Sequence, residues 1–407
     1  MKKIIMLPIV AALVFPTSLF AVAPNPGSDA PGRIVAQSHI PVCPRTHGND
    51  EIQCNSRVIA DKGGKPVVNT LPSGLSPAQI KGAYALNGIT SGKVIAIVDA
   101  YDHPNIKSDL DNYNKTFGLP AFPSCTTSAQ TGCFQKVDQR GGGSYPALST
   151  SWSLEIAMDV EVAHAVCQDC KIILVEADSN SYDNLMAAID TAVRLGANSI
   201  SNSWSSPEFL GETAYDSHLN KPGIAIAFSS GDAGYGTQYP AASQYVTAVG
   251  GTTLNMSGNS YVSETAWSGA GSGCSQYEPQ PAFQSALGLS DCTGRIVADV
   301  SSVADPNTGA AVYNSCNQYD ARRGCKGGWY KVGGTSLATP IVAAVYALAG
   351  DLGSSTSANS LPYVKAGNLR DIASGSNGSC GGSYLCTALP GFDGPTGLGT
   401  PNGWLAF

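Results

Sequence analysis

The chain has 407 residues and 43% hydrophobic residues, enough for one large domain or two ordinary ones with a sizeable buried core. Charged residues make up only 13%, about half the usual share of roughly 25% in soluble domains, and the 46 glycines indicate tight turns and close backbone packing. The formal net charge of -7 disfavours nucleic acid as a partner. We expect a monomer.

The first 23 residues have the pattern of a secretory signal peptide. Two lysines precede an apolar stretch over residues 4–20, and residues 21–23 (Ala-Val-Ala) form the small-x-small pattern that a signal peptidase cuts. An uncleaved membrane anchor is the alternative, but two prolines shorten the apolar run below the roughly 20 residues of a spanning helix. We predict cleavage after Ala23 and a secreted or periplasmic protein that is not bound to a membrane.

All 12 cysteines follow this segment, and an even number in an exported chain indicates disulfide bonds. Sequence alone does not fix connectivity, but the cysteines fall into close neighbours: Cys43 and Cys54, Cys125 and Cys133, Cys167 and Cys170, Cys274 and Cys292, Cys316 and Cys325, Cys380 and Cys386. The tightest pair could instead be redox-active or, with His164, bind zinc. It follows a predicted helix, however, whereas a redox motif belongs where a strand leads into a helix.

Residues 24–74 are rich in Pro, Gly and Asn without sustained periodicity, which predicts an extended arm or short propeptide pinned by one disulfide. Residues 75–407 are predicted to form the functional domain. Helices are expected at residues 77–86, 105–117, 151–165, 182–195 and 336–349, and strands at residues 93–99, 171–177, 197–203, 224–230, 246–250 and 295–300. This alternation predicts a doubly wound α/β fold, in which helices cover both faces of a mainly parallel sheet.

Ser336 lies where the glycine-rich turn Gly333-Gly334 leads into a helix. Pro340 supports this boundary if it falls in the first turn, where its missing N–H costs nothing. Unpaired amides and the helix dipole favour negative charge at such a position, as on an attacked carbonyl oxygen. The alternative is that Thr335 or Ser336 is only a helix cap.

A serine nucleophile needs a base, and no histidine has a suitable sequence context. The segment 152–160 instead carries Glu155 and Asp159. Its apolar residues alternate as in a strand, but preceding polar caps and its length favour a helix, in which the two carboxyls lie one turn apart and can share a proton. The alternative is a solvated acidic face that includes Glu161.

Asp232 follows the predicted strand 224–230, and Asp99 ends the strand 93–99, so both lie at the carboxyl edge where such sheets bind ligands. An aspartate at a strand end is commonly a turn former. Near an acyl-transfer site, a protonated Asp232 would instead donate a hydrogen bond to the oxyanion. That arrangement works best in acid.

These motifs, in this order, resemble the sedolisins, the serine-carboxyl peptidase family with a subtilisin-like fold. The resemblance covers about residue 75 to the C-terminus. It rests on Glu155 and Asp159 in one helix, Ser-Ser-Gly-Asp ending at Asp232, Ala-Asp-Pro-Asn-Thr-Gly at residues 304–309, Gly-Gly-Thr-Ser ending at Ser336, and the C-terminal segments around Asp371 and Asp393.

The resemblance implies Ser336 as nucleophile, Glu155 as general base and later acid, Asp159 as its partner, and Asp232 as the oxyanion carboxyl. Asp99, which resembles the strand-end acid of other subtilases, is given a supporting role. The resemblance also implies one structural calcium ion, bound by the carboxylates of Asp371 and Asp393 and the carbonyls of Ile372 and Gly391.

The sequence departs from the family pattern in two places. Leu389 stands where the family has glycine near the calcium ligands, and residues 24–74 are shorter than the family's folded prodomain. We expect a secreted serine-carboxyl endopeptidase that hydrolyses proteins or peptides through an acyl-enzyme at acidic pH. The alternatives are a subtilase with an Asp99, histidine and Ser336 triad, and an inactive binding module on the same scaffold.

Overall fold

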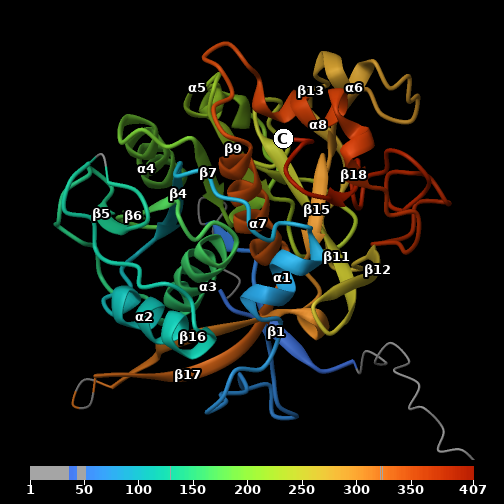
Figure 1. Cartoon of the computed structure of the whole chain (residues 1–407). Helices are drawn as coiled ribbons and strands as arrows, with labels where there is room; N and C mark the ends of the chain where they lie inside the picture. The colour runs from blue at the N-terminus through green and yellow to red at the C-terminus, as the bar shows by residue number, and fades with distance from the viewer. Residues whose placement is uncertain (1–35, 44–51, 129, 321, 323) are drawn as a thin grey trace, which may run out of the picture. The chain divides into compact units, whose positions relative to one another are not determined.

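A computed structural model describes residues 36–43, 52–128, 130–320, 322 and 324–407; the predicted signal peptide lies outside them. Its centre is an eight-stranded sheet (Figure 1). The strands lie in the order β12 (Ser260–Ala266), β11 (Thr247–Ser257), β9 (Ala225–Ser229), β7 (Ser199–Asn202), β4 (Val94–Ala100), β6 (Lys171–Ala177) and β5 (Phe134–Asp138), with β15 (Val300–Val303) also paired to β11. All neighbouring pairs are parallel except β11 and β12. The predicted mainly parallel α/β fold is confirmed.

Helices cover both faces of this sheet, because successive strand residues point to opposite sides. Ile95 and Ile97 of β4 belong to the core formed with α3 (Thr150–Val166) and α7 (Thr335–Ala349), which lie side by side in Figure 1. Ala96 and Val98 belong to the core formed with α4 (Tyr182–Arg194). Asp99 continues the first series, so the alternation directs its side chain towards α3 and α7.

The segment around Glu155 is a helix, as predicted. Ser149 caps α3 by accepting the N–H of Trp152. Every residue from Trp152 to Val166 is buried, including the acidic ones. The alternation of apolar and polar residues therefore does not reflect one buried and one exposed face.

The remaining helices and strands frame this core. The other helices are α1 (Pro77–Ala83), α2 (Ile106–Phe117), α5 (Asp216–Leu219), α6 (Ala282–Ser285), α8 (Leu361–Val364) and the short 3-10 turns Glu212–Tyr215, Pro306–Thr308, Ala358–Ser360 and Ala366–Asn368. The other strands are β1 (His39–Pro41), β2 (Gln53–Cys54), β3 (Arg57–Ile59), β8 (Trp204–Pro207), β10 (Gln238–Tyr239), β13 (Gly273–Pro279), β14 (Gly294–Val297), β16 (Ala310–Asp320), β17 (Gly324–Gly333), β18 (Leu369–Arg370) and β19 (Thr400–Pro401). Within the described part of the chain, no helix combines the length and hydrophobicity needed to cross a bilayer.

Two sequence-based expectations are wrong in detail. The single strand predicted at residues 295–300 is two strands: β14 pairs with β13, whereas β15 pairs with β11. The chain turns between them, where the N–H of Ala298 donates to Gly394 and that of Asp299 donates to Ala248. The arm is also more regular than expected, because β1 pairs with β3, β3 with β17, and β2 with β8.

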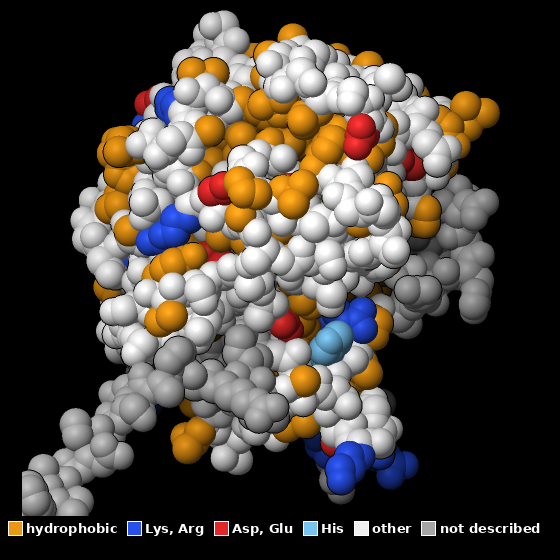
Figure 2. Space-filling view, turned by 90° about the vertical axis from the view of Figure 1, so that its right-hand side faces the viewer, with side chains coloured by type: hydrophobic (Ala, Val, Ile, Leu, Met, Phe, Trp, Pro, Cys, Tyr) orange, Lys and Arg blue, Asp and Glu red, His pale blue; other side chains and the backbone are white. Residues whose placement is uncertain are grey.

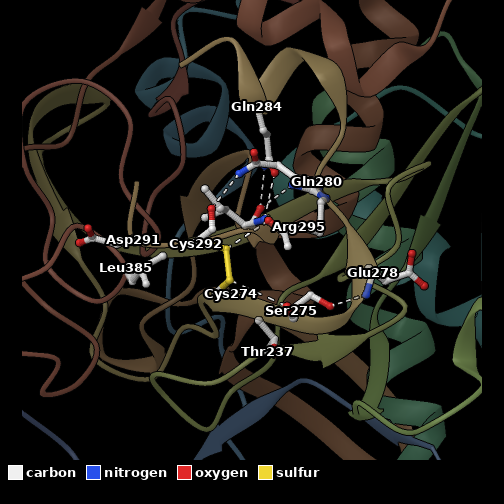
Figure 3. The surroundings of a disulfide bond; sticks show 12 residues. Thr237, Cys274, Ser275, Glu278, Gln280, Gln284, Asp291, Cys292, Arg295 and Leu385 are labelled. Carbon is white, nitrogen blue, oxygen red and sulfur yellow. Dashed lines mark hydrogen bonds between the residues drawn. A yellow bond between two sulfur atoms is a disulfide. The ribbon is translucent and has the colours of Figure 1, made fainter. Parts of the chain in front are cut away.

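All six neighbouring cysteine pairs form disulfides. Figure 3 shows one of them, Cys274–Cys292, which ties β13 to the segment preceding β14. Since Cys167 and Cys170 are joined, they offer no thiolates to zinc, and His164 instead packs against Phe122 with ring centroids 4.0 Å apart. On the face that Figure 2 shows, charged side chains are few among hydrophobic side chains and other, uncharged atoms, as the composition predicts.

Candidate active site

Ser336 is the second residue of α7 and is fully buried. Gly334 precedes the helix with φ 101°, a conformation that favours glycine. The Ser336 hydroxyl donates to the carbonyl of Ser203 at 3.0 Å, and the Ser203 hydroxyl donates to the carbonyl of Ser336 at 3.2 Å. The two serines therefore fix each other's position.

Pro340 explains why the carbonyl of Ser336 is free for this contact. The proline lies inside α7 and not in its first turn, which corrects the sequence-based expectation. In a regular helix the N–H of residue 340 would donate to the carbonyl of residue 336, but proline has no N–H. The freed carbonyl accepts from Ser203 instead, so the proline helps to hold the serine.

Glu155 and Asp159 lie one turn apart on α3, and both are fully buried. Burial is the main cause that raises the pKa of each well above its ordinary value, and the charge of Asp99 raises both further. The nearby hydroxyls of Ser336 and Ser56 oppose this by lowering the pKa of Glu155. Among the described residues, none of the four carboxylate oxygens makes a hydrogen bond of regular geometry, so the site holds unsatisfied buried acceptors.

Asp99 completes this group as a third buried carboxyl. Its two oxygens are buried without a hydrogen-bond partner among the described residues, and burial raises its pKa to about 8. Three carboxyls with mutual electrostatic influence cannot all ionise in a dry site. The group therefore retains protons well into neutral pH and titrates as a unit.

Asp232 approaches Ser336 from the end of β9. Its Oδ1 accepts from the N–H of Thr335 at 2.8 Å and from the Thr335 hydroxyl at 3.0 Å. Its Oδ2 is buried and has no partner among the described residues, although the residue as a whole is partly exposed. Burial of the carboxyl raises its pKa to about 7, and the hydrogen bonds from Thr335 and the charge of Arg57 limit the rise.

Sequence reasoning missed the residues that hold these groups in place. The carbonyl of Ser203 accepts a hydrogen bond from the Ser336 hydroxyl, and the Thr335 hydroxyl donates to Asp232. Ser203 ends the predicted strand 197–203 and Thr335 directly precedes the predicted helix 336–349, which was the available signal. The fold decides which residues Ser203 and Thr335 contact, and no local sequence pattern indicates these partners.

The four histidines that the structure describes lie in other environments. His103 pairs with Asp109 at 3.1 Å, His218 pairs with Asp190 at 2.6 Å, and His39 accepts from Arg57 at 2.8 Å. His164 packs on Phe122, and His47 lies outside the described residues. The described part of the chain thus offers no histidine base beside Ser336.

The predicted calcium ligands lie together in the C-terminal region. Asp371 accepts from the N–H of Gly391 at 2.8 Å, and the carbonyl of Ile372 faces the hydroxyl of Thr396, which also donates to Asp393. Asp393 is fully buried, and its pKa is raised to about 7, mainly by burial and also by the charge of Asp371. Two carboxylates and nearby carbonyls are hard oxygen donors of the type that calcium prefers, so the residues fit such an ion.

The comparisons with known proteins agree with this geometry. The model of the subtilase family matches residues 148–366, which include Glu155, Asp159, Asp232 and Ser336. The chain belongs to the subtilase family.

Two curated relatives place this subtilase beside the sedolisins. It is 27% identical to kumamolisin from Bacillus sp. (strain MN-32) over 91% of this chain and 67% of that protein. It is 28% identical to sedolisin from Pseudomonas sp. (strain 101) over 72% of this chain and 53% of that protein. The predicted recognition as a sedolisin-like chain and the predicted enzyme class, a serine-carboxyl peptidase, are confirmed at this level.

A solved structure shows the same fold. Pseudomonas sedolisin, a serine-carboxyl proteinase solved with two molecules of pseudo-iodotyrostatin, superposes with a TM-score of 0.65 at 24% identity. The match covers 81% of this subtilase and 96% of that chain. The predicted subtilisin-like architecture is therefore confirmed.

Proposed function

We propose that this protein is an exported endopeptidase that cuts protein or peptide substrates through an acyl-enzyme at acidic pH. The observation that carries the proposal is the convergence of Ser336, the Glu155 and Asp159 pair, and Asp232 at the start of α7. No histidine of the described residues joins them. The six disulfides suit an oxidising compartment, in agreement with the predicted signal peptide.

In this mechanism an ionised Glu155 takes the proton of Ser336 as the serine oxygen attacks the substrate carbonyl. Asp159 shares the remaining proton of the pair and orients Glu155. The protonated Glu155 then gives its proton to the leaving amine. Water hydrolyses the ester by the same steps in reverse.

The oxyanion is stabilised by the N–H of Ser336 and by Asp232. Only protonated Asp232 can donate, and its pKa of about 7 keeps it protonated in acid. This requirement favours acidic conditions.

We also propose that the carboxylates of Asp371 and Asp393, with the carbonyls of Ile372 and Gly391, hold one calcium ion. The ion would neutralise the buried charge of Asp393 and close the C-terminal loop, which is a structural role.

Casein hydrolysis measured across pH for the wild type and Ser336→Ala tests the proposal. We expect an acid optimum in the wild type and no activity in the variant. An optimum near neutral pH would contradict the carboxyl mechanism, and no activity at any pH would favour a binding module.

A further inference from the structure

A second group of buried carboxyls lies beside the candidate active site. It comprises Glu208 after β8, Glu212 in the 3-10 turn Glu212–Tyr215, Asp216 at the start of α5, and Glu278 on β13. Glu212, Asp216 and Glu278 are at most 8% exposed. None of the ion pairs formed among the described residues involves any of the four. We refer to these four residues as the outer carboxyl cluster.

The members of the outer carboxyl cluster lie close together in pairs. Glu208 is beside Glu212, and Asp216 is beside Glu278. Oε1 of Glu212 and both carboxyl oxygens of Glu278 are buried and make no hydrogen bond of regular geometry with the described residues. The pKa of Glu212 and that of Glu278 are each raised to about 8, mainly by burial and also by the charges of neighbouring carboxyls. Since two adjacent buried carboxyls do not ionise together easily, each pair retains a shared proton up to about neutral pH.

No basic side chain of the surrounding described elements neutralises the cluster. Those elements carry basic side chains that are paired with other carboxylates: His218 and Lys221 with Asp190, and Arg295 with Asp299. In Figure 3 the carboxylate of Glu278 points away from Arg295. Tyr182 of α4 and Tyr239 of β10 face the cluster with phenols whose pKa values are raised by burial, so they stay neutral. Tyr215 stacks on Tyr182 and donates to the exposed Asp183. Protons are therefore what balances the charges of the cluster within the described part of the chain.

β10 connects the outer carboxyl cluster to the substrate cleft. This short strand pairs antiparallel with β8. Thr237, directly before it, donates to Glu208, and the Tyr239 hydroxyl donates to Asp216 at 3.2 Å. Gln238 lies between them and points to the opposite side, as the alternation of side chains along a strand requires. Both sequence neighbours of Gln238 are thus held by the cluster.

Gln238 is part of the substrate cleft. Its side chain accepts from the Ser205 hydroxyl and lines, with Asp232, a cavity of about 230 Å³. A Cβ placed on Gly231 would lie 2.5 Å from Oε1 of Gln238, so the side chain rests on the backbone directly before Asp232. A substrate positioned for attack by Ser336 therefore enters beside this carboxamide, which can both donate and accept a hydrogen bond.

We propose that the outer carboxyl cluster holds β10 in place by means of its shared protons and thereby positions Gln238 as a substrate-binding residue. The inference rests on the proposed peptidase function and extends it to substrate binding. With its protons in place, the cluster holds Thr237 and Tyr239 and keeps Gln238 at the cavity. As pH rises through about 8, the pairs lose their protons and the carboxylates repel one another, so that β10 shifts and substrate binds more weakly. Loss of the Asp232 proton lowers kcat, whereas loss of the cluster's protons raises KM.

Kinetics on a peptide substrate from about pH 5 to about pH 9 separate these two effects. We expect the wild-type KM to rise at least about fivefold over this range, the effect of losing about one hydrogen bond to substrate. In Glu278→Gln, KM should stay constant within about twofold, because glutamine remains neutral and its amide can donate to Asp216 at any pH. The fall in kcat through the Asp232 pKa of about 7 should be the same in both proteins. The matched control Glu161→Gln, at a buried carboxyl outside the cluster, should follow the wild type.

Thr237 provides a second test that changes no carboxyl and does not depend on how Glu278→Gln folds. Thr237→Val removes the hydroxyl that donates to Glu208 and should raise KM in acid about fivefold with kcat unchanged. Thr237→Ser keeps the hydroxyl and should have the wild-type KM. Gln238→Ala should raise KM to the same extent, and adding Thr237→Val to it should raise KM no further.

The outcomes separate this inference from the proposed function. If the wild type hydrolyses the peptide but its KM does not change with pH, changes equally in Glu278→Gln, or is the same in Thr237→Val and Thr237→Ser, the inference is wrong and the peptidase function stands. If no peptide is hydrolysed at any pH, the proposed function fails and takes the inference with it.

Discussion

The main-chain N–H of Ser336 donates a 2.9 Å hydrogen bond to the carbonyl of Asn55. This contact joins a helix start near the end of the chain to an arm near its beginning. It shows that the amide at the start of α7 is available to a carbonyl oxygen from an extended segment. The same amide is the one that an acyl-transfer reaction would use.

Glu155→Gln should lower turnover by about a thousandfold or more without unfolding the protein, because glutamine keeps the shape of the side chain but cannot accept the serine proton. Measuring kcat on a peptide substrate, with circular dichroism as the check on folding, tests this. Glu161→Gln is the matched control, since Glu161 is buried on the same helix but accepts from the N–H of Tyr313. A near-normal rate in Glu155→Gln would mean that another group is the base.

Asp232→Asn should extend activity towards neutral pH. The wild type loses its oxyanion donor as pH rises through the Asp232 pKa of about 7, whereas the asparagine amide donates at any pH. The Oδ1 of asparagine can still accept from Thr335. The measurement is the pH profile of kcat/KM. In the variant, the fall in kcat/KM on the alkaline side should occur at higher pH than in the wild type. An unchanged alkaline limb would assign that limb to a different group.

The sequence predicted the sheet and its site edge well because both depend on local patterns. Apolar strand runs such as residues 93–99 and 171–177 appear almost where the structure has them, as β4 and β6. Glu155 and Asp159 could be placed together because helix geometry alone brings residues four apart to one face. The resemblance to a family then supplied their roles, which remain predictions.

The contacts of the arm could not be predicted from the sequence. β2 and β3 are two and three residues long, too short for periodicity to reveal, and their partners lie about 150 and 275 residues further along the chain. Pairing at such separations is possible only because the folded chain presents the free edges of β8 and β17 to the arm. The position of Pro340 inside α7 also depends on a contact that is distant in sequence. The Ser203 hydroxyl donates to the carbonyl of Ser336 in place of the N–H that proline lacks.

Stability should fall as pH rises from about 4 to about 8. Asp99, Glu155, Asp159 and Asp232 have raised pKa values in the folded state, whereas unfolded carboxyls titrate near 4. Between these values the folded state binds more protons than the unfolded state, so each added pH unit disfavours folding. One such group contributes up to about 1.4 kcal/mol per pH unit.

Urea unfolding at a series of pH values measures this dependence. Asp99→Asn should reduce the slope by up to one group's contribution, because asparagine removes one titrating group and keeps the size of the side chain. Stability that stays level or rises over this pH range would show that the buried carboxyls are ionised without penalty.

Calcium chelation should lower the melting temperature. Removing the ion would leave the buried Asp393 carboxyl with Asp371 as a like-charged neighbour. At a free calcium concentration about a hundred times Kd, binding would stabilise the folded state by about 2.7 kcal/mol, which corresponds to roughly 3–6 °C. Differential scanning calorimetry with and without a chelator measures the shift. Asp371→Asn should weaken the response by removing one charged ligand, whereas Asp351→Asn should respond like the wild type. An equal melting temperature with and without chelator in the wild type would contradict the proposed calcium site in the C-terminal loop.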